Sequence, residues 1–229
     1  MEAAKNLRFK KTVALSEILE GVWHSPFKYF EDWPILEVRE KCLKEMERRR
    51  FFDSEWLEPC IRELLEGYDN YDFGKKMLSF YIFAERNEVV IRAIEFALSL
   101  WREGRAWEGE LSKVIAGRLL KDKTKLYPKL PSLHGFLEDL LDKLMKKGQR
   151  DGYLASNWYC AERALRIIIA AEDFSFLPKI EELILLLQEG EIYPSKCDPP
   201  YTRDLNLAML RATKRLLLKA KKEKLAEPE

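Results

Sequence analysis

Apolar residues recur along this chain with the 3.6-residue period of an amphipathic α-helix, and no stretch sustains the two-residue alternation of a strand. Composition agrees with this pattern, because leucine, a strong helix former, occurs 35 times and valine only 6 times. The chain is therefore predicted to be all-α. The predicted helices cover residues 12–21, 35–50, 54–66, 72–85, 87–101, 110–120, 133–147, 154–172, 176–188 and 202–224.

Capping residues and glycines set the ends of these helices. Asp53 or Ser54 is suited to cap the helix that Gly67 closes, and Ser132 and Thr202 are expected to cap two later helices.

Two irregular segments interrupt the helical pattern. Residues 121–131 form a linker rich in lysine and proline, and residues 191–201 form a proline-rich loop. We expect one continuous structural unit in three parts: N-terminal helices with an aromatic corner (1–53), a helical array (54–224) and a disordered tail (225–229).

Three of the predicted helices repeat one short pattern: a turn former, any residue, isoleucine or leucine, a charged residue, an acidic residue, leucine, and leucine or isoleucine. This pattern occupies residues 59–65, 135–141 and 178–184. A second set of matches, each with Arg-Ala at its centre, lies at residues 91–94, 162–165 and 210–213. The two sets indicate internal repetition with a unit of roughly forty residues.

These two sets resemble HEAT-like repeats, in which helix pairs stack side by side, with a proline in the first helix and an arginine in the second. The resemblance covers residues 54–224 and implies a HEAT-like α-α superhelix whose second helices line an extended concave binding surface. HEAT units place the arginine shortly after the turn, whereas Pro59 and Arg92, like Pro178 and Arg211, lie far apart. The units therefore either carry long insertions or form an irregular helical array.

The balance of charges excludes two classes of protein. The 40 basic and 39 acidic side chains give a net charge of +1, which excludes an acidic solvating tail and argues against a dedicated polybasic nucleic-acid binder. The longest apolar runs, such as Ile167 to Ala171, are far too short to span a membrane. The first residues contain no apolar signal core, so we expect a cytoplasmic protein with free thiols.

The chain offers little for metal or cofactor chemistry. Its 4 cysteines include no Cys-x-x-Cys pair, and its 2 histidines are His24 and His134. No glycine-rich phosphate loop, nucleophile elbow or cluster of metal ligands occurs in the sequence. We therefore predict no metal, no cofactor and no catalytic residue. An enzyme stays open as an alternative, because catalytic groups can assemble in space without a motif.

An aromatic corner within residues 21–34 is the first candidate site. Trp23, His24, Tyr29 and Trp33 could wall a pocket or anchor a partner, because tryptophan and tyrosine dominate binding hot spots. The alternative is a helix–loop–helix corner whose aromatic rings cover one end of the core.

One face of the helix predicted at 154–172 is the second candidate. Trp158, Glu162 and Arg166 follow one another at four-residue intervals and so share that face. They could hold a polar partner at the rim of a groove. Alternatively, Glu162 and Arg166 form an ordinary ion pair over a tryptophan at the edge of the core.

The last predicted helix is the third candidate. Arg211, Arg215, Lys219 and Lys222 form a basic stripe opposite an apolar one. This stripe is either the solvated face of an amphipathic helix or a surface that contacts phosphates, in nucleic acid or at a membrane.

We predict a non-catalytic protein-binding module that docks a partner along a groove lined by second helices. The residues expected beside that groove are Trp158, Glu162, Arg166, Arg211 and Arg215. The alternative is nucleic-acid binding or DNA processing through the basic C-terminal helix. Some HEAT-like proteins of similar size are alkylpurine DNA glycosylases, but the acidic-aromatic catalytic motif of that family has no match here. A small-molecule pocket in the aromatic corner is a third hypothesis.

Overall fold

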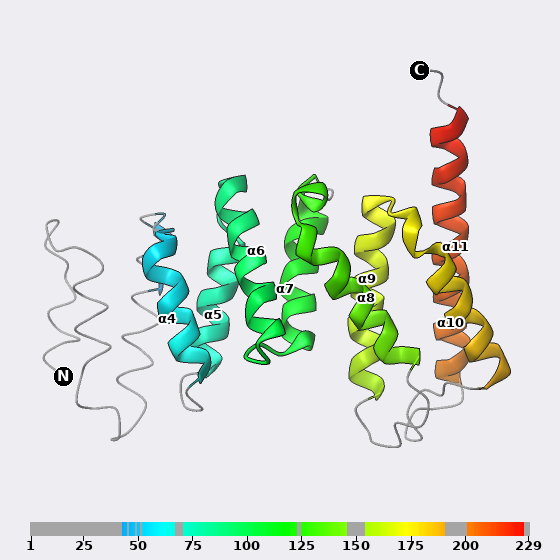
Figure 1. The fold of residues 1–229 in the computed structure, drawn as a ribbon, viewed down its shortest axis with the longest axis horizontal. Coiled ribbons are helices and arrows are strands. Elements are labelled where there is room, and N and C mark those ends of the chain that lie inside the picture. The colour runs from blue at the N-terminus through cyan, green and yellow to red at the C-terminus, as the bar shows by residue number, and fades with distance from the viewer. Residues whose placement is uncertain are drawn as a thin grey trace, which may run out of the picture. The chain divides into compact units, whose positions relative to one another are not determined.

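The computed structural model describes residues 43–44, 46–48, 50, 52–66, 71–122, 125–145, 154–190 and 201–226. Every regular element in these ranges is helical and none is a strand, which confirms the all-α prediction (Figure 1). The chain divides into two compact units between Val90 and Ile91. This division lies inside a helix, whereas the sequence analysis expects one continuous unit whose first part ends at residue 53.

The first unit contains the helix pair α4 (Ser54–Glu66) and α5 (Tyr71–Ile82). Asp53 caps α4, because its Oδ1 accepts a hydrogen bond from the Glu55 amide at 3.0 Å. The two helices approach closely at Gly74, where a Cβ atom would lie 3.0 Å from the Cβ of Leu64. The sequence pattern thus predicts both helices and the cap of the first.

The second unit begins within α6 and contains the remaining described elements. These are α6 (Asn87–Arg102), α7 (Glu108–Lys121), the 3-10 turn η2 (Tyr127–Lys129), α8 (Pro131–Met145), α9 (Leu154–Ala171), the 3-10 turn η3 (Phe174–Phe176), α10 (Leu177–Glu189) and α11 (Tyr201–Ala226).

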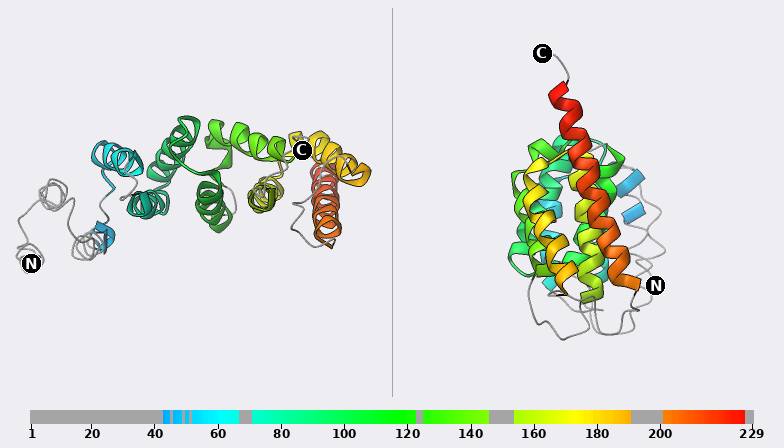
Figure 2. Two further views of the ribbon diagram at one scale, coloured as in Figure 1. Left: turned by 90° about the horizontal axis from the view of Figure 1, so that it is seen from below. Right: turned by 90° about the vertical axis from the view of Figure 1, so that its right-hand side faces the viewer.

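The helices of the second unit form two layers. In one layer α9 packs between α7 and α11, and in the other α8 packs against α10. Two contacts place α6 beside α8: the rings of Trp101 and Phe136 meet edge to face with centroids 4.9 Å apart, and the Ser132 amide donates to Glu95 Oε1 at 3.3 Å. Successive helices therefore alternate between the layers, as the left view of Figure 2 shows for this unit.

The position of α6 corrects one inference from the sequence. The Arg-Ala matches group residues 91–94 with 162–165 and 210–213, which would place α6 in the same layer as α9 and α11. The contacts above place it beside α8 instead. The reason is that a four-residue match in leucine-rich helices marks which side of a helix is buried and carries no information about its neighbour.

The first repeated pattern, in contrast, marks the buried side of three helices. Its apolar positions are all buried in the structure, in α4 of the first unit and in α8 and α10 of the second. These positions are Ile61, Leu64 and Leu65 in α4, Leu137, Leu140 and Leu141 in α8, and Ile180, Leu183 and Ile184 in α10. Since α8 and α10 share a layer, the pattern recurs at equivalent places in the second unit.

Several predicted boundaries shift by a few residues. Helix α8 begins at Pro131, a residue suited to a first helical turn, so Ser132 lies within the helix and is not its cap. The segment predicted as a linker contains η2 and is anchored by Leu126 and Leu130, both buried. Helix α11 continues through Ala226, two residues beyond its predicted end.

Some predicted elements lie outside the described residues. These are the helix at 12–21, all but a few residues of the helix at 35–50, and the loop at 191–200. Within the described ranges, none of the helices combines the length and apolar character that crossing a bilayer requires.

Candidate functional site

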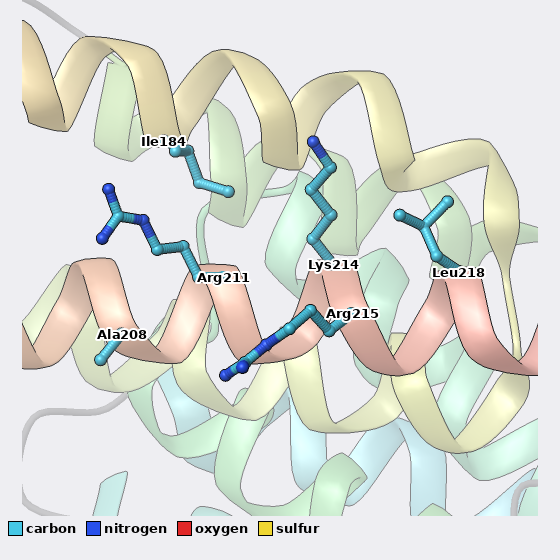
Figure 3. A pocket seen from close by; sticks show the side chains of 6 residues that line it. All are labelled: Ile184, Ala208, Arg211, Lys214, Arg215 and Leu218. Atoms are coloured by element: carbon cyan, nitrogen blue, oxygen red, sulfur yellow. The ribbon is translucent and has the colours of Figure 1, made fainter.

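An open hollow of about 640 Å³ lies between α10 and α11 in the second unit (Figure 3). Its lining residues are Ile184 from α10 and Ala208, Arg211, Lys214, Arg215 and Leu218 from α11. The α11 residues at 208, 211, 215 and 218 follow helical spacing, so one face of α11 forms most of the surface.

The opposite face of α11 holds the helix in place. Leu210, Thr213 and Leu217 are buried on that face. At the start of α11, Arg203 donates hydrogen bonds to the carbonyl oxygens of Leu187 at 2.9 Å and Gln188 at 2.6 Å. These carbonyls belong to the last turn of α10 and have no partner within that helix, so Arg203 satisfies them and joins the two helices.

The cations around the hollow differ in their partners. Lys214 forms an ion pair with Glu181 of α10 at 2.9 Å, and this carboxylate neutralises the charge of the lysine. Arg211 and Arg215 are exposed, and neither guanidinium makes an ion pair or hydrogen bond to any residue in the described part of the chain. Two guanidinium groups one helical turn apart are therefore available to an anion, and their planar donor arrays match carboxylate or phosphate oxygens.

Apolar side chains form the remaining surface of the hollow. Ile184 is 8% exposed and Leu218 is 37% exposed. Figure 3 shows Ile184 reaching from α10 into the space between the helices, with Arg211 and Lys214 extending towards it from α11. The hollow thus offers an apolar contact area beside positive charge.

The structure brings together two of the residues predicted to bind a partner, Arg211 and Arg215. Trp158 is only 7% exposed and does not line the hollow. Glu162 and Arg166 do not line the hollow either; they lie on α9 and form an ion pair with each other at 2.6 Å. The predicted aromatic corner, with Trp23, His24, Tyr29 and Trp33, lies outside the described residues.

Four lining residues were not predicted: Ile184, Ala208, Lys214 and Leu218. Ala208 and Leu218 continue the spacing of Arg211 and Arg215, so a longer reading of the same helical face would have found them. Ile184 belongs to another helix, and its role follows only from the pairing of α10 with α11.

A second cluster of polar side chains surrounds Asp173, at the turn between α9 and α10. Its Oδ2 accepts hydrogen bonds from Tyr127 Oη at 2.7 Å and from His134 Nδ1 at 3.2 Å. Its Oδ1 accepts from the Ser175 amide at 3.1 Å and from Ser175 Oγ at 2.5 Å. A serine, a histidine and an aspartate are thus close together, although the sequence shows no motif around His134.

The geometry of this cluster is structural and does not suit nucleophilic catalysis. Ser175 donates to Asp173, so the imidazole of His134 accepts no proton from it, as a serine nucleophile would require. Burial, the hydrogen bond to Asp173 and the charge of Asp173 all raise the pKa of Tyr127, which therefore stays protonated as a donor. The cluster joins η2 and α8 to the turn at η3.

In the described ranges, no group of three or more histidine, cysteine, aspartate or glutamate side chains could hold a metal ion.

Comparisons of the chain with protein-family models, with curated proteins and with solved structures found no match. The geometry of the hollow therefore carries the functional proposal.

Proposed function

We propose that this chain is a non-catalytic protein-binding module whose partner docks in the hollow between α10 and α11. The observation that carries the proposal is the pair of guanidinium groups of Arg211 and Arg215, which lie beside an apolar surface and have no ion-pair or hydrogen-bond partner among the described residues. Arginine is enriched at binding hot spots, and such residues contribute most where neighbouring apolar groups exclude water. Ile184 and Leu218 supply that apolar neighbourhood.

The stacked architecture supports this function. Alternating layers in the second unit and the repeated buried pattern in α8 and α10 favour HEAT-like hairpins, which commonly serve as scaffolds for partners. The binding surface we propose lies at the seam between α10 and α11, and not along a face shared by α9 and α11 as the sequence suggested.

Nucleic-acid binding is the second candidate, because the same guanidinium groups match phosphate oxygens. Three observations favour a protein partner. Among the described residues no aromatic side chain lines the hollow for a base to stack on, and Trp158 is buried. Acidic residues are interspersed with the cations, since Glu181 pairs with Lys214 and Glu223 pairs with Lys219.

The proposed setting is the cytoplasm. Cys160 is a buried free thiol, and free thiols persist in a reducing compartment.

In the test, the full chain and two charge-reversal variants are each immobilised on a support and incubated with native lysate. The double variant R211E/R215E alters the hollow. The double variant K113E/K121E makes the same change in net charge at exposed positions of α7 that do not line the hollow. The wild-type chain and K113E/K121E should each retain one protein in stoichiometric amount, and R211E/R215E should retain less than about a tenth as much.

The absence of any stoichiometric protein on the wild-type chain would contradict the proposal, as would equal retention by all three chains. A parallel titration with labelled duplex DNA and single-stranded RNA at low salt addresses the second candidate. Salt-sensitive binding of either nucleic acid, abolished in R211E/R215E, would favour that candidate instead. Circular dichroism of both variants checks that the helices remain intact.

A further inference from the structure

Among the helices that the structure describes, the hairpin of α10 and α11 has neighbours on one side only. Within the second unit, α10 contacts α8 and α11 contacts α9, and no other described helix packs against the opposite side of this hairpin (Figures 1 and 2). The hollow lined by Ile184, Arg211 and Leu218 lies on the seam of this hairpin. If the protein-binding function proposed above holds, we infer that the partner docks there as an amphipathic α-helix that presents carboxylates to Arg211 and Arg215.

The seams already formed within the unit show the chemistry that such a helix would reproduce. Between α8 and α10, Lys179 bridges Glu138 at 3.0 Å and Asp142 at 2.7 Å, two carboxylates one helical turn apart. Between α10 and α11, Lys214 pairs with Glu181. Each of these seams joins a cation on one helix to carboxylates on its neighbour.

Further seams follow the same rule. Lys143 of α8 forms an ion pair with Glu108 of α7, and Lys224 of α11 pairs at 2.7 Å with Glu172, next to the end of α9. Arg211 and Arg215 are cations of the same kind, and no described residue supplies them with a carboxylate. Charge complementarity therefore selects an acidic partner.

The shape of the hollow favours a helix over an extended segment. Its α11 residues lie along one face from 208 to 218, which spans about three helical turns and forms a straight ridge next to α10. A helix packs into the groove between two helices by the ridge-and-groove geometry that also joins the layers here. A peptide that binds by strand addition would need an open strand edge for its backbone, and the described ranges contain no strand.

A second copy of this chain is disfavoured as the occupant. A two-fold symmetric contact at the hollow would place Arg211, Lys214 and Arg215 against the same residues of the other copy. Like charges brought together in this way are strongly unfavourable. The occupant is therefore a different protein. Its helix has two acidic residues, Asp or Glu, four positions apart on one face, and apolar residues spaced by three and four positions on the adjoining face.

The experiment measures binding of the full chain to two fluorescein-labelled peptides by anisotropy. Both contain about 18 residues, because shorter isolated helices are marginal in water. The first places leucines at i, i+3 and i+7 with glutamates one turn apart on the adjoining face. The second has the same composition in an order that distributes leucine and glutamate evenly around the helix.

We expect the first peptide to bind about tenfold more tightly than the second. We also expect R211E/R215E to lose about tenfold in affinity for the first peptide and K113E/K121E, altered on α7 away from the hollow, to lose none. The milder variant R211Q/R215Q, which adds no repulsion, should still lose affinity. Equal binding of the two peptides, or equal binding by wild type and R211E/R215E, would overturn the helical acidic partner.

These outcomes are distinct from failure of the proposed function. If the lysate experiment captures a protein through Arg211 and Arg215 but the two peptides bind equally, the module binds a partner that is not an acidic amphipathic helix, and this inference alone fails. If no protein is captured, the proposed function fails and the inference fails with it.

Discussion

Tyr127 donates a hydrogen bond of 2.7 Å to Asp173, a residue 46 positions further along the chain. This bond ties η2, which precedes α8, to the turn between α9 and α10. The segment around Tyr127 has the composition of a linker, but the bond and the buried side chains of Leu126 and Leu130 hold it against the helices. Residues 125–130, which precede α8, are therefore held against helices of the second unit.

The substitution Tyr127→Phe should lower the free energy of unfolding by about 1–2 kcal/mol, because it removes a hydrogen bond to an ionised and partly buried carboxylate. Urea denaturation followed by circular dichroism measures this loss. Tyr159→Phe is the matched control, since Tyr159 is 63% exposed and has no recorded partner in the described ranges. Equal stability of the two variants would show that the Tyr127 hydrogen bond contributes nothing.

The ionisation of Asp173 should make stability depend on pH in the acid range. Partial burial raises the pKa of Asp173, but hydrogen bonds from Ser175, Tyr127 and His134 outweigh it and hold the pKa below its usual 3.8. A carboxylate with a lower pKa in the folded state stabilises that state fully above the unfolded-state pKa. This stabilisation is lost as the pH falls through the folded-state pKa.

The free energy of unfolding of the wild type should therefore fall more steeply between pH ~5 and pH ~2 than that of Asp173→Asn. The difference in stability between the two proteins should be largest near neutral pH and should vanish at the acid end. A difference that grows as the pH falls would contradict the assigned direction of the pKa shift. Urea titrations at several pH values measure it.

The edge-to-face contact between Trp101 and Phe136 should couple α6 to α8 energetically. In a double-mutant cycle of Trp101→Leu and Phe136→Leu, the coupling between the two rings should be roughly 0.5–1.5 kcal/mol. Each single substitution also loses packing in the core, since Phe136 is fully buried. A coupling free energy near zero would argue that α6 does not belong to the layer of α8.

The helices and their buried faces could be predicted because both depend on local patterns. Ile61, Leu137 and Ile180 occupy the same position of a repeated motif, and all three are buried. The layer of α6 could not be predicted in this way. Its neighbours depend on Trp101, Phe136 and Glu95, and the sequence carries no local sign of which distant helix these residues meet.

The candidate site shows the same limit. Arg211 and Arg215 stand out in the sequence because a basic stripe is a property of one helix. Ile184 completes the hollow from another helix, and Asp173 meets His134 across 39 positions, so neither contact leaves a local pattern. Trp158 was chosen for its residue type, yet its position on the inward side of α9 buries it.

The bridge from Lys179 to Glu138 and Asp142 should contribute more to stability than an exposed ion pair within one helix. Lys179→Met should lower the free energy of unfolding by roughly 1 kcal/mol at neutral pH, because its side chain is 17% exposed and its ammonium meets two carboxylates of α8. Lys219→Met is the control: its side chain is 73% exposed and lies 3.7 Å from Glu223, so almost no loss is expected. Partial burial lowers the pKa of Lys179, but the two carboxylates outweigh this and raise it above 10.5. The contribution should therefore be complete below that pH and disappear only as the pH rises through the folded-state pKa. Equal losses in free energy of unfolding for Lys179→Met and Lys219→Met at neutral pH would show that the bridge between α8 and α10 stabilises the fold no more than the exposed ion pair does.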